Sequence, residues 1–495
     1  MTVEPSAGGE PPPAPGATRL IAGPLNRVEG DVEIKLDVEN GRVSAAYVTA
    51  PLFRGFERIL EGKDPRDALT ITPRICGICS VSQSMAAARA LGAAQGVTPP
   101  ENGLRAIALI HAAENLADHL THFHLFFMPD FARAAYAEQP WAAEMTLRHK
   151  AQSGAAARAF AEARAQLMHV MGVLAGKWPH TLAVQPGGAT KAPSARDKVR
   201  LTAVIRAFRA AMERDLYGAP LEEIVALTDR AALARWAAAR GEGDLRLFLR
   251  AAETLDLFEM GRGPERFLST GGYETPDGLL FKSGSLRHGA REAADLSDMT
   301  EDAAWSWAQD PAPRHPFDGV TEPDGAMRQG YSWCKAPRLR GETVEVGALA
   351  RQAVDGHPLA LELIRGGASV AGRVVGRLLE SARLILAMEA LAAAIEPGAS
   401  FITRAETPDS ARAVGLTEAA RGVLGHWLVI ERGRIANYQI VAPTTWNFSP
   451  RDGAGVPGPV EAALVGAPVF EGERTPMAVQ HIVRSFDPCM VCTVH

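Results

Sequence analysis

The sequence predicts a mainly α-helical protein, with a core of long helices and small β-hairpin (α+β) elements near both ends. Apolar residues recur at helical spacing over residues 103–127, 155–176, 197–214 and 347–395, in stretches rich in Ala, Leu and Arg. Strand-like alternation is confined to segments around residues 31–47 and 426–441. We therefore expect segments of mixed structure at the two ends of a helical core.

Four regions follow along the chain. They are a disordered tail (1–18), an N-terminal β-hairpin region (19–70), a helical core (71–400) with an irregular insertion around 265–345, and a C-terminal α+β region (401–495). The tail is rich in Pro and Gly and has too few apolar side chains to offset the entropy of ordering. The two hairpins are predicted from alternating apolar residues around turns at Asn40-Gly41 and Gly433.

Composition excludes several classes of protein. With 495 residues, 47% of them hydrophobic, the chain can bury a large core. A net charge of −5, with no stretch in which basic residues alternate with aromatic ones, argues against a nucleic-acid partner. No apolar run reaches the roughly 18 residues that cross a bilayer, and no signal peptide is evident. We expect a cytoplasmic protein without direct membrane insertion.

Four of the five cysteines form two CxxC pairs at opposite ends of the chain, Cys76/Cys79 and Cys489/Cys492. Four thiolates brought together would hold a soft transition metal. A structural zinc site and a redox dithiol are the alternatives for such spacing, although zinc-binding pairs usually lie within tens of residues of each other. Either the two ends of the chain meet at one metal centre, or the two pairs are unrelated.

The residues flanking the cysteines resemble the large subunit of nickel-iron hydrogenases, whose signatures are RxCGxC and DPCxxCxxH. They read Arg74-Ile75-Cys76-Gly77-Ile78-Cys79 and Asp487-Pro488-Cys489-Met490-Val491-Cys492-Thr493-Val494-His495. Further blocks of the same family occur in the same order, as Arg27–Gly30, Arg54–Glu57, Arg421–Trp427 and Pro443–Asn447. The resemblance covers about residues 20–495.

This resemblance implies a Ni-Fe(CN)2(CO) centre. All four cysteines would bind nickel, and Cys79 and Cys492 would also bridge to the iron. Heterolytic cleavage of H2 would pass a proton to Cys489 and then to Glu29, the residue that matches the family's proton relay. Without the motif, Glu29 beside Arg27 would be read as a surface ion pair.

Other site residues are also assigned by the resemblance. Asp118, Arg421 and Asp487 would form a charged canopy over the open metal position, and Arg421 and Thr444 would donate hydrogen bonds to the cyanides. For Asp118 and Arg421 the alternative is a buried structural ion pair. A Mg2+ site would use Glu57, the carbonyl oxygen of Ile440 and His495. His111, His119, His122 and His124 are interpreted as packing groups or groups one contact removed from the metals.

Several positions depart from the usual pattern. Gln83 stands where the family usually has a histidine, Asp31 replaces another histidine, and Ala420 replaces a proline. The sequence also stops at His495, so a C-terminal extension either was removed or was never encoded. These features resemble the regulatory, hydrogen-sensing branch of the family. A neutral amide at Gln83 would change the hydrogen bonding to a bridging sulfur.

The expected partners follow from the same resemblance. Outside the four site cysteines only Cys334 remains, so iron-sulfur clusters are expected only in a small subunit. The first hypothesis is a hydrogen sensor of low turnover that signals to a histidine kinase. The second is a catalytic uptake hydrogenase that feeds electrons to a respiratory chain. The third, a metal-free structural relative of the family, conflicts with the presence of all four cysteines.

Overall fold

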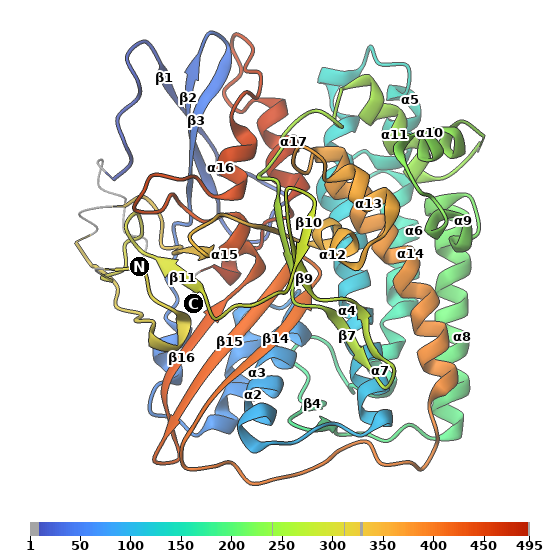
Figure 1. Cartoon of the computed structure of the whole chain (residues 1–495). Helices are drawn as coiled ribbons and strands as arrows, with labels where there is room; N and C mark the ends of the chain where they lie inside the picture. Colours follow the sequence, from blue (N-terminus) through green and yellow to red (C-terminus); the bar gives the residue numbers. More distant parts are fainter. Residues whose placement is uncertain (1–8, 240, 311, 327–329, 494–495) are drawn as a thin grey trace.

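The computed structural model describes residues 9–239, 241–310, 312–326 and 330–493. Seventeen α-helices and sixteen β-strands, together with short 3-10 and π-helical turns, make up these parts of the chain. The architecture is therefore mixed α+β, and the more specific prediction of a mainly α protein is not confirmed. The long helices stand together on one side of the molecule, and most of the sheet structure lies on the other (Figure 1).

The N-terminal region forms a three-stranded antiparallel sheet in the order β1 (Thr18–Ala22), β2 (Glu33–Glu39) and β3 (Arg42–Thr49). The predicted hairpin is confirmed, with Asn40 and Gly41 both at positive φ in its turn. Residues 1–8 of the predicted tail lie outside the described residues. Glu10, which belongs to the same predicted tail, accepts hydrogen bonds from Arg19 and Lys35.

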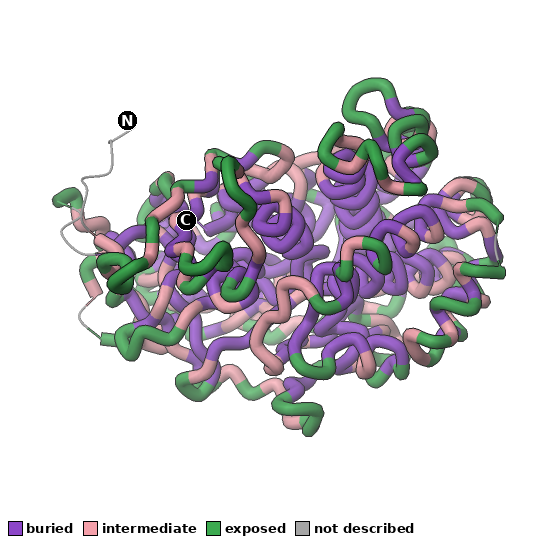
Figure 2. The backbone as a smooth tube through the Cα atoms, turned by 90° about the horizontal axis from the view of Figure 1, so that it is seen from above, coloured by how far each residue is buried: buried purple, intermediate pink, exposed green. Residues whose placement is uncertain are grey.

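Long helices form the other half of the molecule. The main ones are α4 (Glu101–Thr121), α6 (Ala155–Leu167), α8 (Ala195–Met212) and α14 (Val370–Ala394), whereas the long helix α3 (Ser80–Gln95) lies against the C-terminal sheet. Helix α14 packs against both α4 and α8, and most of its side chains are buried. The buried backbone runs through the interior, and the exposed segments lie at the periphery (Figure 2).

Two of the predicted helices are interrupted. The segment 347–395 contains α12 (Ala348–Asp355), α13 (Pro358–Leu363) and α14, because Gly356 ends α12 in the left-handed region and Pro358 starts α13. The segment 155–176 contains α6 and α7 (His169–Leu174). Short helices complete the described structure: α1 (Phe56–Leu60), α2 (Ala68–Ile71), α5 (Ala142–His149), α9 (Leu221–Val225), α10 (Arg230–Ala239), α11 (Asp244–Thr254), α15 (Pro443–Asn447), α16 (Pro459–Leu464) and α17 (Met477–Ser485).

The predicted insertion around 265–345 contains small sheets. A four-stranded sheet has the order β10 (Ala290–Glu292), β9 (Gly284–Arg287), β6 (Arg266–Ser269) and β13 (Glu345–Val346). Three further pairs are β7 (Gly272–Thr275) with β8 (Gly278–Phe281), β11 (Met299–Asp302) with β12 (Ala336–Leu339), and β4 (Val184–Gln185) with β5 (Gly188–Ala189), the last before the insertion. Strands of two to four residues are too short to produce a recognisable alternation.

The C-terminal region contains a three-stranded antiparallel sheet, β14 (Ala411–Ala419), β15 (Gly422–Glu431) and β16 (Arg434–Val441). The predicted hairpin is confirmed as β15 and β16, but β14 was not predicted. Helix α3 lies directly on β14: a Cβ atom at Gly415 would come within 1.9 Å of the Ala86 carbonyl oxygen. Close contact with α3 thus requires glycine here, a residue that weakens the strand pattern in the sequence.

No helix within the described ranges combines the length and the apolar composition that a bilayer span requires.

Candidate metal centre

The two cysteine pairs meet in the interior of the protein. The sulfurs of Cys76 and Cys489 are 3.4 Å apart, those of Cys79 and Cys492 are also 3.4 Å apart, and those of Cys489 and Cys492 are 2.9 Å apart. All four sulfurs lie within 4.8 Å of one another, and all four residues are buried. The expectation that the two ends of the chain converge at one cluster is confirmed.

Local structure explains how each pair is held. Cys76 follows a 3-10 turn (Thr72–Ile75), and Cys79 is the N-cap residue of α3. Cys489 precedes a second 3-10 turn (Met490–Cys492) that follows α17. Each pair therefore lies in a short turn next to a helix, where two sulfurs three residues apart can face the same side.

Arg54 connects the two cysteine loops directly. Its guanidinium group donates to the carbonyl oxygen of Ile75 and, at 3.2 Å, to that of Val491. These carbonyls belong to the residues immediately before Cys76 and Cys492. One side chain thus fixes the spacing between the N-terminal and the C-terminal halves of the cluster.

The thiol cluster fits a soft cation. Hydrogen bonds from Cys489 and the other sulfurs hold the pKa of Cys76 well below its usual value. The pKa of Cys79 is raised well above its usual value by the same neighbours, and that of Cys489 by burial. Four adjacent buried thiols cannot all ionise unless a positive charge compensates them, and a bound transition metal supplies this charge.

Asp118, Arg421 and Asp487 come together as predicted from the sequence. The Arg421 guanidinium group donates to both carboxylate oxygens of Asp118, at 2.9 Å for Nη2 to Oδ1, and to Oδ1 of Asp487 at 3.1 Å. Its Nε also donates to the backbone oxygen of Asp487 at 2.9 Å. Asp487 precedes the second cysteine pair by two residues, so this ion pair network lies next to the cluster.

The pKa values of the two carboxyl groups that share Arg421 are shifted in opposite directions. Burial raises the pKa of Asp118 to about 8, although Arg421 opposes this shift. For Asp487 burial also disfavours the charge, but Arg421, His122 and Arg377 outweigh it and lower the pKa. The pair therefore holds a proton on Asp118 more readily than on Asp487.

Glu29 lies beside the cysteine loop and not in a surface ion pair. It forms a parallel β-bridge with Cys489, whereas Arg27 pairs with Asp130. The side chain is half-buried, and burial together with the negative charge of Cys76 raises its pKa. Both observations agree with a carboxyl group that can hold a proton near the sulfurs.

Thr444 and Gln83 lie close to the cluster with different partners. The Thr444 hydroxyl oxygen accepts a hydrogen bond from the Cys489 amide at 3.1 Å. The Gln83 side-chain oxygen accepts one from Nε2 of His426 at 2.8 Å, and Nδ1 of His426 lies 2.8 Å from the Tyr438 hydroxyl. The Gln83 side-chain oxygen is thus bonded to a histidine, and the expected effect of Gln83 on the hydrogen bonding of a bridging sulfur stays a prediction.

The predicted Mg2+ ligands are described in part. Glu57 is buried, and its Oε1 accepts a hydrogen bond from the Ile440 amide at 2.7 Å, while its Oε2 accepts one from Thr321. His495 lies outside the described residues. Glu57 lines a small cavity, and a second buried carboxyl group, Glu301, lines the same cavity. Burial raises the pKa of Glu301 to about 7. The cavity thus offers two carboxyl groups to a hard cation.

Two groups near the cluster were not predicted from the sequence. The first is Glu114, a buried carboxylate that accepts hydrogen bonds from the backbone amides of Val81 and Ser82 and from the Trp178 indole. Burial raises its pKa to about 7. Glu114 therefore fixes the first turn of α3, which begins directly after Cys79, and no sequence motif identifies it.

The second is a series of buried, mostly charged residues that contact one another, starting at Asp487. Arg377 donates to Asp487 at 3.0 Å and lies 3.2 Å from Nδ1 of His119, whose Nε2 is 3.1 Å from Glu380. Arg351 then joins Glu380 to Glu418. All six of these residues are buried. Because the partners lie far apart in the sequence, spacing alone could not reveal them.

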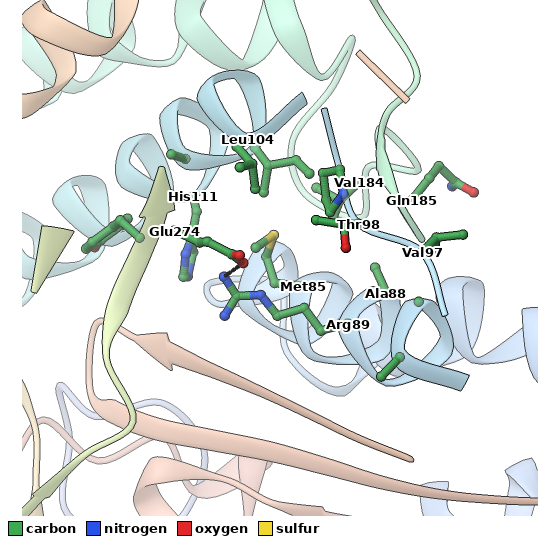
Figure 3. Close-up of a pocket in the computed structure, with 17 residues that line it drawn as sticks. Met85, Ala88, Arg89, Val97, Thr98, Leu104, His111, Val184, Gln185 and Glu274 are labelled. Atoms are coloured by element: carbon green, nitrogen blue, oxygen red, sulfur yellow. Dashed lines mark ion pairs between the residues drawn. The ribbon is translucent and has the colours of Figure 1, made fainter. Parts of the chain in front are cut away.

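A cavity of about 200 Å³ lies between α3 and α4, with β7 at its side (Figure 3). Met85, Leu104 and Val184 supply apolar walls, and the Arg89–Glu274 ion pair, at 3.6 Å, lies at one side. His111 also lines it and is 3.1 Å from the hydroxyl of Ser82, three residues after Cys79. Burial lowers the pKa of His111 to about 3, so the imidazole is neutral.

Comparison with known proteins agrees with this geometry. The sequence model of the family described as nickel-dependent hydrogenase matches residues 54–167 and 159–495. The chain is 32% identical to the periplasmic [NiFeSe] hydrogenase large subunit of Desulfomicrobium baculatum, over 98% of this chain and 96% of that protein. It is 29% identical to the hydrogenase-2 large chain of Escherichia coli, over 96% and 97% of the two chains.

Solved structures show the same similarity. The reduced Ni-Fe-Se hydrogenase of D. vulgaris Hildenborough superimposes with a TM-score of 0.83 at 29% identity, covering 97% of this chain and all of the other. The similar proteins include uptake hydrogenase large subunits, among them that of Rhodobacter capsulatus at 28% identity over 96% and 95% of the two chains. None of these names denotes a hydrogen sensor, so the more specific assignment to the regulatory branch gains no support from them.

The family match over residues 54–495, the similarity at 32% identity and the four-sulfur cluster lead to one conclusion. The chain belongs to the nickel-dependent hydrogenase family, and it is the large subunit of an enzyme that oxidises H2.

Proposed function

We propose that this chain is the large subunit of a catalytic uptake hydrogenase, which oxidises H2 and passes the electrons to a partner. The convergence of four buried sulfurs within 4.8 Å is the observation that carries the proposal. Names of similar proteins, such as uptake hydrogenase large subunit, support catalytic turnover over sensing. Cys76, Cys79, Cys489 and Cys492 would hold the Ni-Fe(CN)2(CO) centre.

When bound, that centre supplies the polarisation that splits H2 heterolytically. The protein then has to accept and remove a proton. The Cys489 sulfur takes it first, and Glu29, held beside the Cys489 loop by a β-bridge, receives it next. A carboxyl group with a raised pKa suits this role, since it holds a proton more readily than a fully solvated glutamate does.

Arg421 supplies a fixed positive charge and hydrogen-bond donors to this site. Its position between Asp118 and Asp487 leaves the guanidinium group little freedom to reorient. Arg421 and Thr444 are the donors that we assign to the cyanide ligands of the iron. Because the Thr444 hydroxyl oxygen accepts a hydrogen bond from the Cys489 amide, the hydroxyl hydrogen is left to donate to a cyanide.

A Mg2+ ion near the C-terminal sheet completes the proposed cofactor set, with Glu57, the Ile440 carbonyl oxygen and His495 as ligands. Electrons would leave through a small subunit that carries iron-sulfur clusters. The fifth cysteine, Cys334, is buried, and its sulfur donates to the Lys335 carbonyl oxygen at 3.2 Å. A single cysteine of this kind cannot ligate a cluster alone.

The direct test is metal analysis and infrared spectroscopy of the purified large and small subunit complex. We expect nickel, iron, bands from carbon monoxide and cyanide, and H2-dependent reduction of an artificial electron acceptor. Cys76→Ser should lose nickel and activity, whereas Cys334→Ser is the matched control and should keep both. Zinc in place of nickel, or a Cys76→Ser protein that keeps its nickel and its activity, would refute the proposal.

The hydrogen-sensing role is a second candidate, and Gln83 is the observation that favours it. Gln83 stands at the position after the first cysteine pair where the family usually has a histidine, and its side chain is hydrogen-bonded to His426. In this case the output would go to a histidine kinase, and a cytoplasmic location would be expected. Rapid H2 oxidation by the purified complex, with turnover unaffected by Gln83→His, would argue against sensing.

A further inference from the structure

Helix α3 begins at the metal centre without a cap of its own. Its N-cap residue is Cys79, whose side chain makes no capping hydrogen bond. A side-chain oxygen at this position of a helix commonly accepts a hydrogen bond from the amide of the second or third helical residue. The Cys79 sulfur instead faces the other cysteine sulfurs, and that of Cys492 is 3.4 Å away. The amides of Val81 and Ser82 therefore need an acceptor from elsewhere in the chain.

Glu114, on α4, supplies this acceptor. Its Oε2 accepts a hydrogen bond from the Val81 amide at 2.9 Å, and its Oε1 accepts one from the Ser82 amide at 3.0 Å. The hydroxyl groups of Ser80 and Ser82 donate to the same two oxygens at 3.2 and 3.3 Å. A carboxylate at the N-terminus of a helix is also stabilised by the helix dipole. A residue of a neighbouring helix thus caps α3 in place of its own N-cap side chain.

The same carboxylate holds a segment that lies against the start of α3. The Trp178 indole donates to Oε2 of Glu114 at 2.8 Å. Two residues later, the His180 amide donates to the Ser80 hydroxyl at 3.2 Å. Glu114 therefore connects three parts of the chain next to the first cysteine pair: α4, the first turn of α3 and residues 178–180. Since Glu114 is 1% exposed, water does not replace these contacts.

Helix α4 carries a second buried carboxyl group one turn further on. Asp118 follows Glu114 by four residues, so the two side chains lie on the same face of the helix. Asp118 pairs with Arg421, whereas Glu114 caps α3. One face of α4 thus supports both the Arg421 ion pairs and the start of the helix that follows Cys79.

We propose that Glu114 is a positioning residue of the metal centre, which fixes the Cys79 sulfur by capping α3 from α4. This inference rests on the proposed function, in which Cys79 is a metal ligand. Residues that orient metal ligands typically change metal affinity or activity by about 10–100-fold when they are replaced. A glutamine at position 114 can offer its single oxygen to only one side, and its NH2 group then faces N–H donors on the other.

Glu114→Gln in the intact large and small subunit complex tests this. We expect the Val81 and Ser82 amides to exchange hydrogen at least about tenfold faster, because they lose a charged acceptor. The infrared bands of carbon monoxide and cyanide should shift, and kcat for H2 oxidation should fall about tenfold or more. Glu114→Asp keeps the negative charge on a shorter side chain and should shift the bands less. If the glutamine variant does not assemble, the aspartate variant carries the same test.

Glu461→Gln is the matched control. Glu461 is also buried, and it accepts hydrogen bonds from the Val48 amide and the Tyr331 hydroxyl, which lie outside the cysteine cluster. Both substitutions disturb a buried carboxyl group, but only those at Glu114 should shift the infrared bands and lower kcat. Unchanged bands in both Glu114 variants, or the same shift in Glu461→Gln, would overturn this inference alone. A natural complex without nickel or without these bands would refute the proposed function, and the inference with it.

Discussion

Glu29 and Cys489 are neighbours in a parallel β-bridge. The Glu29 amide donates to the Pro488 carbonyl oxygen at 3.2 Å, and the Met490 amide donates to the Glu29 carbonyl oxygen at 2.7 Å. The backbone of Glu29, the proposed proton acceptor, is thus hydrogen-bonded to the residues on both sides of Cys489. This arrangement does not depend on the Glu29 side chain, so that side chain can be changed without moving the loop.

Glu29→Gln should therefore abolish proton transfer while the metal centre stays intact. The amide has nearly the same shape as the carboxyl group but cannot hold a proton near neutral pH. We expect H2/D2O exchange and H2 oxidation to fall by about 100-fold or more, with nickel and iron content unchanged. Glu29→Asp, which keeps a carboxyl group, should retain part of the activity. If the glutamine variant exchanged at the normal rate, Glu29 would be removed from the proton path.

Arg54→Lys should loosen the connection between the two cysteine loops. Two guanidinium nitrogens of Arg54 donate, Nη1 to the Ile75 and Val491 carbonyl oxygens and Nη2 to the Arg74 carbonyl oxygen at 3.2 Å, and the single nitrogen of a lysine cannot occupy both positions. We expect a lower nickel content per protein and a lower thermal midpoint. Arg58→Lys is the control, because Arg58 makes an exposed ion pair with Glu322. Equal nickel content in the two variants would show that Arg54 does not hold the loops together.

Sequence patterns predicted the site better than the fold. The cysteines and Arg421 lie in short motifs, and a motif keeps its chemistry regardless of the surrounding secondary structure. Strand β14 was missed because contact with α3 imposes Gly415 and leaves no clear alternation. Glu114 and Arg377 were missed for another reason: their roles depend on partners that only the folded chain brings close.

Arg421→Lys should lower H2 oxidation more than metal binding. The planar guanidinium group donates to both oxygens of Asp118 and to Asp487, and lysine can satisfy only part of this arrangement. We expect kcat to fall by about 100-fold, while nickel and iron remain bound.

The control for Arg421→Lys is Arg338→Lys. Arg338 is also buried and pairs with Asp452 at 2.8 Å, outside the cysteine cluster. Both variants disturb a buried ion pair, so both should lose thermal stability, but the control should keep its kcat. A similar loss of kcat in both would attribute the effect to general destabilisation and not to the charge near the metals.

Glu461→Gln should change how stability depends on pH. Glu461 is buried and accepts hydrogen bonds from the Val48 amide at 2.9 Å and the Tyr331 hydroxyl at 2.8 Å. Its Oε2 has no hydrogen-bond partner among the described residues and lies 3.8 Å from Arg451. Burial raises the pKa of Glu461 from 4.5 to about 7. The folded state therefore binds this proton more tightly than the unfolded state, and the stabilisation is complete below pH 4.5 and is lost as the pH rises through 7.

A glutamine stays neutral throughout, so the variant should be relatively more stable than the natural protein at pH 8 than at pH 5. The shift corresponds to at most about 3 kcal/mol between these two pH values. Thermal midpoints of both proteins at pH 5 and pH 8 measure it, with the exposed Glu431→Gln as a control that should show no such difference. If the midpoint difference between Glu461→Gln and the natural protein is the same at both pH values, the folded and unfolded states bind the Glu461 proton equally, and burial does not raise its pKa.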